Sequence, residues 1–510
     1  MAIIGNIIKG VINLGSSISF EASHVQNQKE TLRFLLDKAK ATEFGKKYQF
    51  SKILRSHSTY QDFKNNIPYF NYDKMHEEWW HKLHEGKANI TWPGKPEYFA
   101  LSSGTTGKTS KRIPVTEAMI EAIRNAGIKQ ILAMKNFDLP ADFFEKEIMM
   151  LGSSTNLEQN NNYLEGEISG ISASRIPFWF RGFYKPGEEI AKIDDWDERV
   201  QKIAENAKSW DIGALSGIPS WMELMMQNVI DYHKVKHIHE IWPNLKVYTS
   251  GGVAFGPYEK SFKRLTGKHV EVVDTYLASE GFIALQTRPE TSSMQLLTDN
   301  GIFFEFVPFQ PEYIEQDGSL KADAPSIGLE DVELHKDYVL LISTVSGIWR
   351  YSIGDTIQFT NIEKAEIKIT GRTKFFLNTV GSQLSVNKMD DAMRQLEDEF
   401  DIEISEYTIC AKRAEDDEFY HFWYLGASQV NLDTEEVAKK LDGFLKTANK
   451  NYKVARSKAL HGVKVNLIKP SVFYNWNARN KKKGGQVKME RVMNEEKFGE
   501  WENFVKKNDH

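Results

Sequence analysis

The chain has 510 residues, of which 41% are hydrophobic and 26% are charged, a composition typical of a globular protein with two to four structural units. Its formal net charge of -5 argues against a global basic field, so no nucleic-acid partner is expected. The single cysteine, Cys410, excludes an intrachain disulfide and argues against thiolate metal sites. This cysteine usage is typical of a reducing compartment, and we expect a cytoplasmic location.

The first 21 residues are apolar in patches that Asn6, Lys9 and Asn13 interrupt. They lack the charged start, uniform apolar run and cleavage site of a signal peptide. We therefore expect an amphipathic helix packed on the body of the protein, and a membrane-surface helix is the alternative. No stretch of about 20 apolar residues occurs, so the sequence predicts no membrane span.

Short apolar runs alternate with helical patterns along the first three quarters of the chain. Four runs are predicted to be buried strands, at residues 148–152, 245–248, 270–273 and 338–342. Each run ends in small or polar residues, and strand ends of this kind bind ligands in α/β sheets. Between them, Ser220 is expected to cap a helix carrying Trp221. The pattern predicts an α/β fold with a site at one sheet edge.

The last 130 or so residues follow a different pattern. A helix is predicted at 387–400, and two strands, at 407–409 and 422–425, flank a polar turn. Asp433 then opens another helix as part of a capping box. The order predicts a small α+β domain. We place the boundary within 371–381, which gives an N-terminal domain of residues 1–375 and a C-terminal domain of residues 376–510.

Residues 101–109 read LSSGTTGKT. Gly104 and Gly107 allow close backbone approach, and the hydroxyl and N–H groups between and around them suit phosphate oxygens. The segment differs from the Walker A motif, because these two glycines enclose only two residues. Taken alone, a flexible turn is an equally good interpretation.

Residues 102–108 resemble the phosphate loop of adenylate-forming enzymes, the luciferase and acyl-CoA synthetase superfamily. Further segments narrow the resemblance to the auxin-responsive (Gretchen Hagen) acyl acid–amido synthetase family. These read YLASEG at 276–281, FFEFVP at 303–308, WRYSIGD at 349–355, GR at 371–372 and QVKMER at 486–491. They keep the family's order and extend the resemblance over most of the chain.

The resemblance implies a large N-terminal adenylate-forming domain, with β-sheets flanked by helices, and a small, mobile C-terminal lid. It also implies that ATP activates a small carboxylic acid as acyl-AMP, which then forms an amide with an amino acid. Two alternatives stay open: transfer of the acyl group to coenzyme A or a carrier thiol, and nucleotide binding without turnover. The sequence does not indicate the acid, the amine or the oligomeric state.

Acyl-adenylate formation brings a carboxylate against the α-phosphate, so the site needs cations and N–H donors rather than a covalent nucleophile. The resemblance implies that the loop residues hold the phosphates: Ser102, Ser103, Gly104, Thr105, Thr106, Gly107 and Lys108. Lys108 would add positive charge, and a solvent-facing loop lysine is the alternative.

Two carboxylates are assigned to the nucleotide. Glu280, after Ser279 in the Tyr-x-x-Ser-Glu segment, is implied to hold Mg²⁺ on the phosphates, because hard cations prefer oxygen ligands. The alternative for Glu280 is a helix cap. Asp355 is expected in a turn after Gly354, where it would accept hydrogen bonds from the ribose hydroxyls. The alternative is a turn-forming aspartate.

The remaining nucleotide contacts come from three segments. Tyr276 is expected to stack on adenine, and the backbone of Gly251 and Gly252 to line the base. Arg350 is expected to be buried among aromatic residues, so it needs a phosphate, ribose or carboxylate partner. Arg372 is implied by resemblance to contact the ribose near the hinge.

The resemblance makes Lys488 the catalytic lysine of the lid, which reaches the α-phosphate; a solvated tail lysine is the alternative. Two positions depart from the family. Gln383 stands where the family often has lysine, and Glu490 stands where it usually has proline. Both departures favour the alternative of nucleotide binding without turnover.

The histidines and the cysteine that could take part in catalysis are interpreted as structural residues. His233, His237 and His239 lack the zinc-protease pattern and are predicted to form an exposed polar face. Cys410, in an apolar stretch without a neighbouring base, is predicted to be a buried core residue rather than a nucleophile. Residues 216–220 resemble an acyl-pocket wall of the family.

Overall fold

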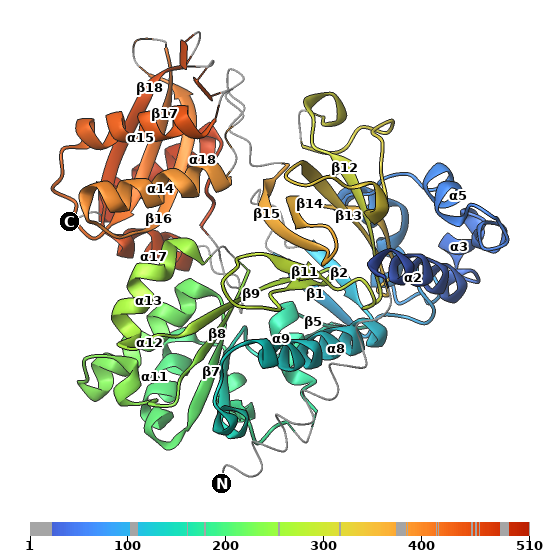
Figure 1. The fold of residues 1–510 in the computed structure, drawn as a ribbon, viewed down its shortest axis with the longest axis horizontal. Coiled ribbons are helices and arrows are strands. Elements are labelled where there is room, and N and C mark those ends of the chain that lie inside the picture. The colour runs from blue at the N-terminus through green and yellow to red at the C-terminus, as the bar shows by residue number, and fades with distance from the viewer. Residues whose placement is uncertain are drawn as a thin grey trace. The chain divides into compact units, whose positions relative to one another are not determined.

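The computed structural model describes residues 23–508, except 103–110, 161, 178–179, 253–254, 316–317, 374–383, 385, 415, 417, 450–451, 454–455, 458–459 and 480–488. The amphipathic helix expected at the N-terminus lies outside the described residues. The chain forms two compact units (Figure 1). Unit 1 comprises Met1–Val253 and Lys263–Ile369, and unit 2 comprises Ala254–Phe262 and Thr370–His510.

Unit 1 begins with a group of helices: α2 (His24–Ala39), α3 (Glu43–Lys47), α4 (Phe50–Ile53), α5 (Thr59–Asn66), α6 (Tyr72–Met75), η1 (His76–Trp80) and α7 (His81–His84). Ser23 caps α2, since its side chain accepts a hydrogen bond from the Gln26 amide. The buried aliphatic residues of α2 recur at helical spacing: Leu32, Leu35, Leu36 and Ala39. The Gln28 side chain also bonds the backbone of Ile302 and Phe304, which fixes α2 against a strand of the main sheet.

A four-stranded sheet follows, in the order β2-β1-β5-β4. Its strands are β1 (Tyr98–Ser102), β2 (Lys111–Val115), β4 (Glu158–Gln159) and β5 (Leu164–Gly166). The first two strands form an antiparallel hairpin in which Ser102 lies opposite Lys111. Helix α8 (Glu117–Ala133) starts after β2, because Thr116 accepts a hydrogen bond from the Met119 amide at 3.2 Å.

The main sheet has eleven strands in the order β12-β13-β14-β15-β11-β10-β9-β8-β7-β3-β6. The strands are β3 (Glu147–Leu151), β6 (Tyr184–Lys185), β7 (Ile212–Gly217), β8 (Val247–Gly251), β9 (Glu271–Ala278), β10 (Gly281–Leu285), β11 (Met294–Leu296), β12 (Ile302–Pro308), β13 (Asp337–Thr344), β14 (Ile348–Asn361) and β15 (Glu366–Arg372). Strands β6, β3, β7, β8 and β9 pair in parallel, whereas β9, β10 and β11 pair antiparallel. All four strands predicted from apolar runs are confirmed.

The helices between these strands are α9 (Ile168–Ser174), α10 (Glu188–Ala191), α11 (Trp196–Asn206), α12 (Pro219–His233) and α13 (Glu259–Thr266). The described chain also contains short 3₁₀ turns: η2 (Met134–Asn136), η3 (Ala141–Glu145), η4 (Ala207–Ser209), η5 (Ile238–Glu240), η6 (Gly256–Tyr258), η7 (Pro311–Tyr313) and η8 (Leu329–Asp331). The prediction that Ser220 caps α12 is wrong, because the helix already begins at Pro219. Proline suits that position, where the backbone N–H would have no helical partner.

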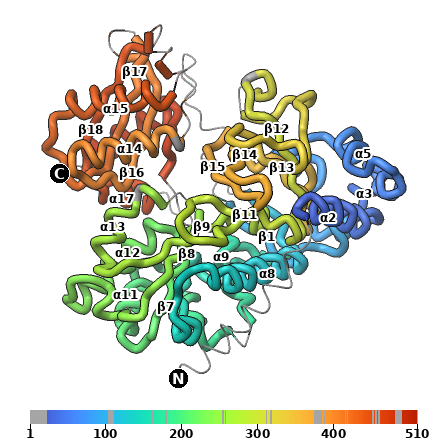
Figure 2. The backbone as a smooth tube through the Cα atoms, in the orientation of Figure 1, coloured from blue at the N-terminus to red at the C-terminus, as the bar shows by residue number. Residues whose placement is uncertain are grey.

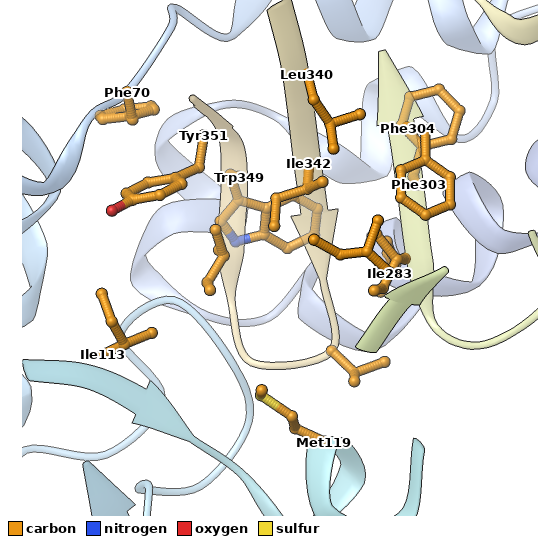
Figure 3. Close-up of a cluster of buried hydrophobic side chains, with 14 of the residues drawn as sticks. Phe70, Ile113, Met119, Ile283, Phe303, Phe304, Leu340, Ile342, Trp349 and Tyr351 are labelled. Atoms are coloured by element: carbon orange, nitrogen blue, oxygen red, sulfur yellow. The ribbon is translucent and has the colours of Figure 1, made fainter. Parts of the chain in front are cut away.

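The core of unit 1 packs the N-terminal helices against β12, β13 and β14, and Figure 3 shows Trp349 of β14 beside Ile342 of β13. Trp349 is fully buried and stacks on Phe44, with ring centroids 5.7 Å apart. Its indole N–H donates to the carbonyl of Thr91 at 3.1 Å. A buried tryptophan with a satisfied N–H is a strong anchor, and it holds the strand that carries Asp355.

Unit 2 contains a three-stranded sheet, β16 (Ile404–Arg413), β17 (Phe419–Ala427) and β18 (Leu460–Ile468), in that order. Its helices are α14 (Val386–Phe400), α15 (Thr434–Ala448), α17 (Pro470–Arg479) and α18 (Glu495–Asn508), coloured orange to red in Figure 2. Strand residues alternate between two cores: Ile409 packs with α14 and α15, and Cys410 packs with α17 and α18. The predicted helix and hairpin are confirmed, and Asp433 caps α15.

Candidate functional site

Ser279 and Glu280 form the two-residue turn of the β9–β10 hairpin, in which Ala278 pairs with Gly281. The Glu280 side chain is buried, with only 7% of the residue exposed. The alternative role as a helix cap is wrong, because the chain continues directly into strand β10. A carboxylate is therefore held in a tight turn at the end of β9, the position expected for a ligand of a hard cation.

Tyr276 and Asp355 lie together. The Tyr276 hydroxyl donates a hydrogen bond to the Asp355 carboxylate, although three strands separate β9 from β14 in the sheet order. Tyr276 is buried, while Asp355 is partly exposed. The structure thus places the expected adenine and ribose residues side by side.

The expectation that Asp355 lies in a turn is wrong, because β14 runs without interruption from Ile348 to Asn361. The local signal for a turn was Gly354, which does have a left-handed φ of 89°. In this strand the glycine lies in an irregularity of the β13–β14 register, between the pairs Leu341–Ser352 and Val339–Thr356, rather than in a chain reversal. Asp355 belongs to the same irregular segment.

Gly251 and Gly252 lie at the end of β8, beside β9. A Cβ on Gly251 would lie 2.9 Å from the hydroxyl oxygen of Thr275, so a side chain here would displace a hydroxyl that bonds the Ser250 carbonyl. Gly252 has a φ of 85° and is exposed. Both positions therefore leave the backbone bare next to the strand that carries Tyr276.

Asp274 is a residue of this region that the sequence interpretation missed. It lies two positions before Tyr276 on β9 and therefore on the same face of the strand. Burial raises its pKa to about 6. The available signal was its spacing from Tyr276 in a strand that ends at the Ser279–Glu280 turn.

Arg350 has a carboxylate partner, one of the three kinds that the sequence left open. Its Nε and Nη2 donate to the two oxygens of Glu305, both at 3.0 Å. Its other bonds go to the Ser326 hydroxyl and to the carbonyls of Lys64 and Ile67. The five N–H groups of the guanidinium are thus matched by five hydrogen bonds, so this buried side chain serves the core rather than a nucleotide.

The β1–β2 hairpin carries the glycine-rich segment. Ser102 is the last residue of β1 and is partly buried; Ser103, Gly104, Thr105, Thr106, Gly107 and Lys108 lie outside the described residues. Near the loop end of the hairpin, Arg112 on β2 binds Glu165 on β5 through two hydrogen bonds of 2.7 and 3.1 Å. This ion pair spans β1 and was not predicted, because its partners are 53 residues apart in sequence.

The tail and hinge residues belong to unit 2. Arg372 ends β15, and Lys488 and Gln383 lie outside the described residues. Glu490 is described: its carboxylate binds the Lys497 ammonium group, and its carbonyl accepts a hydrogen bond from the Thr408 hydroxyl at 2.8 Å. The departure from proline at position 490 is therefore accommodated by an internal ion pair.

The histidine prediction is wrong, because the three residues do not share an exposed face. His239 is buried, and its ring nitrogens face the carbonyls of Thr266 and Leu245. His237 follows the end of α12, and only His233 lies within that helix. The backbone turns after Lys234, which adopts a left-handed conformation, and this turn carries His239 into the interior.

Cys410 is buried, as predicted, and burial raises its pKa to about 12. Within the described ranges, no group of three His, Cys, Asp or Glu side chains is arranged to hold a metal ion. None of the helices that the structure describes has the length and apolar character needed to cross a membrane.

Comparison with known protein families gives three matches along the chain. Models of the GH3 family match its N-terminal domain at residues 18–201, its central domain at 295–372 and its C-terminal domain at 387–497. The chain belongs to the GH3 family. The matched segments make up more than half of the chain, and they confirm the resemblance found in its motifs.

Among curated relatives, jasmonoyl–L-amino acid synthetase GH3.5 of Oryza sativa is 22% identical over 506 residues, covering 84% of this chain and 85% of the relative. Indole-3-acetic acid-amido synthetase GH3.2 of Arabidopsis thaliana is 26% identical over 220 residues, covering 40% and 39%. The first is named as a synthetase of jasmonoyl–L-amino acids and the second as an amido synthetase of indole-3-acetic acid.

Solved structures show the same fold. The GH3.15 acyl acid amido synthetase superposes with a TM-score of 0.78 at 16% identity, covering 98% of this chain and 96% of its own. A 2-hydroxyisobutyryl-CoA ligase in the postadenylation state gives a TM-score of 0.57 at 14% identity, covering 94% and 91%. The predicted α/β fold of the GH3 and adenylate-forming enzymes is thus confirmed.

Proposed function

We propose that this GH3 protein is an AMP-forming acyl acid–amido synthetase, which activates a small carboxylic acid with ATP and transfers the acyl group to an amino acid. The observation that carries the proposal is the match to three GH3 domains in their order. The curated relatives, named as amino acid synthetases, extend over most of the chain.

In the proposed site, the segment from Ser102 to Lys108, between β1 and β2 in the sequence, holds the phosphates of ATP. Asp355 accepts hydrogen bonds from the ribose, and the Tyr276 ring packs on adenine. The hydrogen bond between these two residues supports the assignment, because it orients the carboxylate before the nucleotide binds. The bare backbone of Gly251 and Gly252 suits close contact with the base.

Mg²⁺ is part of the proposal. Protein sites for Mg²⁺ commonly use one or two carboxylates and complete the coordination with substrate phosphates and water. The buried carboxylate of Glu280 fits that donor set, so a cluster of three protein ligands is not required. The bound cation would neutralise phosphate charge while Glu280 holds it in place.

The two compact units suggest how substrate binding and lid function are divided along the chain. We propose that residues 1–375 bind ATP and the acid, and that residues 376–510 form a mobile lid that carries Lys488. The break between the two compact units at Ile369 and Thr370 supports this division. We also place Arg372 at the ribose, near the hinge to the lid. A cytoplasmic location completes the proposal, in keeping with a lone buried thiol.

Transfer of the acyl group to coenzyme A is a second candidate, because a CoA ligase shares the fold. The higher TM-score with an acyl acid amido synthetase and the GH3 domain matches favour the amine. The third candidate, nucleotide binding without turnover, rested on the departures at Gln383 and Glu490. The second of these supports is weaker, because the Lys497 ion pair neutralises the Glu490 carboxylate inside unit 2.

The test is a screen of carboxylic acids against amino acids, read by mass spectrometry, with acid-dependent exchange of labelled pyrophosphate into ATP as the first-step assay. Amide products together with exchange would support the proposal, and coenzyme A replaces the amine in a parallel set. Acid-dependent release of ADP and inorganic phosphate would overturn it. Thioester without amide would instead establish the second candidate.

A further inference from the structure

A buried ion pair lies in unit 2, at the base of the segment that carries Lys488. Arg491 Nη1 donates to Glu406 Oε2 at 2.6 Å and to the carbonyl of Tyr407 at 3.2 Å. The guanidinium also lies 4.3 Å from the centre of the Tyr407 ring. Glu406 itself is only 6% exposed. An arginine that combines hydrogen bonds with ring stacking is not readily replaced by lysine.

Neighbouring groups complete this network. Tyr258 donates to the second oxygen of Glu406 at 3.0 Å, and the Tyr407 hydroxyl donates to Asp390 at 2.6 Å. Burial raises the pKa of Tyr258 well above its ordinary value, so it remains a neutral donor. The partners come from η6, α14 and β16, and a buried charge with this many partners fixes one geometry.

The backbone around Arg491 is fixed to β16 as well. The Ile409 amide donates to the Arg491 carbonyl at 2.8 Å, and the Met493 amide donates to the Ile409 carbonyl at 2.9 Å. Val492 forms a parallel bridge with Ile409. Met489 is buried with α17 and α18. Residues 489–493 are therefore held on the sheet by both side chains and backbone.

We propose that Arg491 is a positioning residue for Lys488. Three residues of chain span at most about 11 Å, so fixing Arg491 on β16 limits how far the backbone of Lys488 can reach from that strand. The inference rests on the proposed function, in which Lys488 supplies positive charge as the acyl-adenylate forms. Arg491 acts through Lys488 and does not itself contact ATP.

Unit 2 contains a matched control. Arg456 donates to both oxygens of Asp442, at 2.6 and 2.9 Å, and the Tyr452 hydroxyl binds the same carboxylate at 2.7 Å. The exposed fraction of the side chain is similar, 14% for Arg456 and 17% for Arg491. Loss of either pair should lower the stability of unit 2, but only Arg491 lies three residues from Lys488.

The experiment compares R491K, R456K, K488A and the double variant R491K/K488A in the full chain. Pyrophosphate exchange gives kcat and the KM for ATP, reaction of preformed acyl-adenylate with the amine gives the second step, and thermal melting measures stability. We expect R491K to lower kcat for exchange roughly 100-fold, as displacement of a catalytic group by about 1 Å does. The KM for ATP and the second step should stay near parental values.

The controls decide between positioning and stability. R456K should melt earlier but keep the parental kcat per folded molecule, and R491K should cause no further loss in the K488A background, since the two residues act as one unit. Parental exchange by R491K, an equal loss in R456K, or a fully additive double variant would overturn the inference. A parental chain without exchange for any acid would instead refute the proposed function. If R491K fails to fold, E406Q, which keeps the shape of the carboxylate, takes its place with the same expectations.

Discussion

The Tyr276 hydroxyl donates a hydrogen bond to the Asp355 carboxylate across a sheet in which three strands separate their own. The strands between them are β10, β11 and β15, so the sheet must curve to bring the two residues together. This contact joins the parallel part of the sheet to its antiparallel part. It also orients the carboxylate that we assign to the ribose.

Replacing Asp355 with alanine should weaken ATP binding, because a charged hydrogen-bond acceptor is lost. Such a bond is worth roughly 1.5–3 kcal/mol, or about 10- to 150-fold in Kd. Tyr276→Phe keeps the ring but removes the orienting hydrogen bond, and should cost roughly 0.5–1.5 kcal/mol. Calorimetric titration of both variants and of the double variant measures these losses. Unchanged affinity in folded D355A would reject the ribose assignment.

Replacing Glu280 with glutamine should raise the Mg²⁺ concentration needed for half-maximal pyrophosphate exchange. The substitution keeps the shape of the side chain in its two-residue turn and removes one ligand charge. Glu271→Gln, at the other end of β9, is the control and should leave the Mg²⁺ curve unchanged. Superimposable curves for E280Q and the parent would show that Glu280 has only a structural role.

Glu165 should matter for both stability and ATP binding, because its ion pair with Arg112 ties β5 to β2, the strand that follows the glycine-rich segment in the sequence. Glu165→Gln should destabilise unit 1 by roughly 1–3 kcal/mol, the typical cost of disrupting a charged pair with one buried partner. It should also raise the KM for ATP. The control is Glu117→Gln, whose partner Arg175 forms an exposed pair worth less than about 1 kcal/mol. Equal effects of the two variants on both measurements would contradict this role.

His421 should make unit 2 sensitive to acid. It is fully buried, and among the described residues neither ring nitrogen has a hydrogen-bond partner; burial lowers its pKa to about 3. Since the unfolded state binds a proton below pH 6.5 and the folded state does not, stability should fall as pH drops from 6.5 towards 3. The limiting slope is about 1.4 kcal/mol per pH unit, or roughly 2 kcal/mol by pH 5.

Melting curves at pH 7 and pH 5 test this expectation. His421→Leu should reduce the difference between the two pH values, because the group that takes up the proton on unfolding is gone. His461→Leu, which changes an exposed histidine of β18, should leave the difference as it is in the parent. An unchanged pH dependence in H421L would show that other groups cause the acid sensitivity.

The elements that could be predicted from sequence depend on local patterns. Apolar runs predicted the strands β3, β8, β9 and β13, and Asp433 predicted the start of α15. These predictions succeeded because helix capping and hydrophobic periodicity depend on a few neighbouring residues. The Ser279–Glu280 turn was missed as a hairpin, since it contains neither glycine nor asparagine, the usual turn signals.

The site depends instead on contacts between distant segments. Arg350 was expected to be buried, but its partner Glu305 lies 45 residues away, and Asp355 lies 79 residues from Tyr276. The register and curvature of an eleven-stranded sheet decide which of these side chains meet, and no local pattern encodes them. Family motifs supplied the candidates, and the fold then showed which of the described candidates lie together.

Replacing Lys488 with alanine tests the division of work between the units most directly. If the lid delivers this charge to the α-phosphate, adenylation should slow by about 10²–10³, the usual cost of removing such a stabiliser. ATP affinity should stay near parental, because Asp355 and the β1–β2 hairpin belong to unit 1. Reaction of preformed acyl-adenylate with the amine should be largely kept, since the charge is needed while the carboxylate attacks. Lys497→Ala, which removes the partner of Glu490, is the control for changes to the same tail. Adenylation at the parental rate in K488A would make Lys488 a solvated residue, and Lys108 or a lysine among 481–483 would then become the candidate.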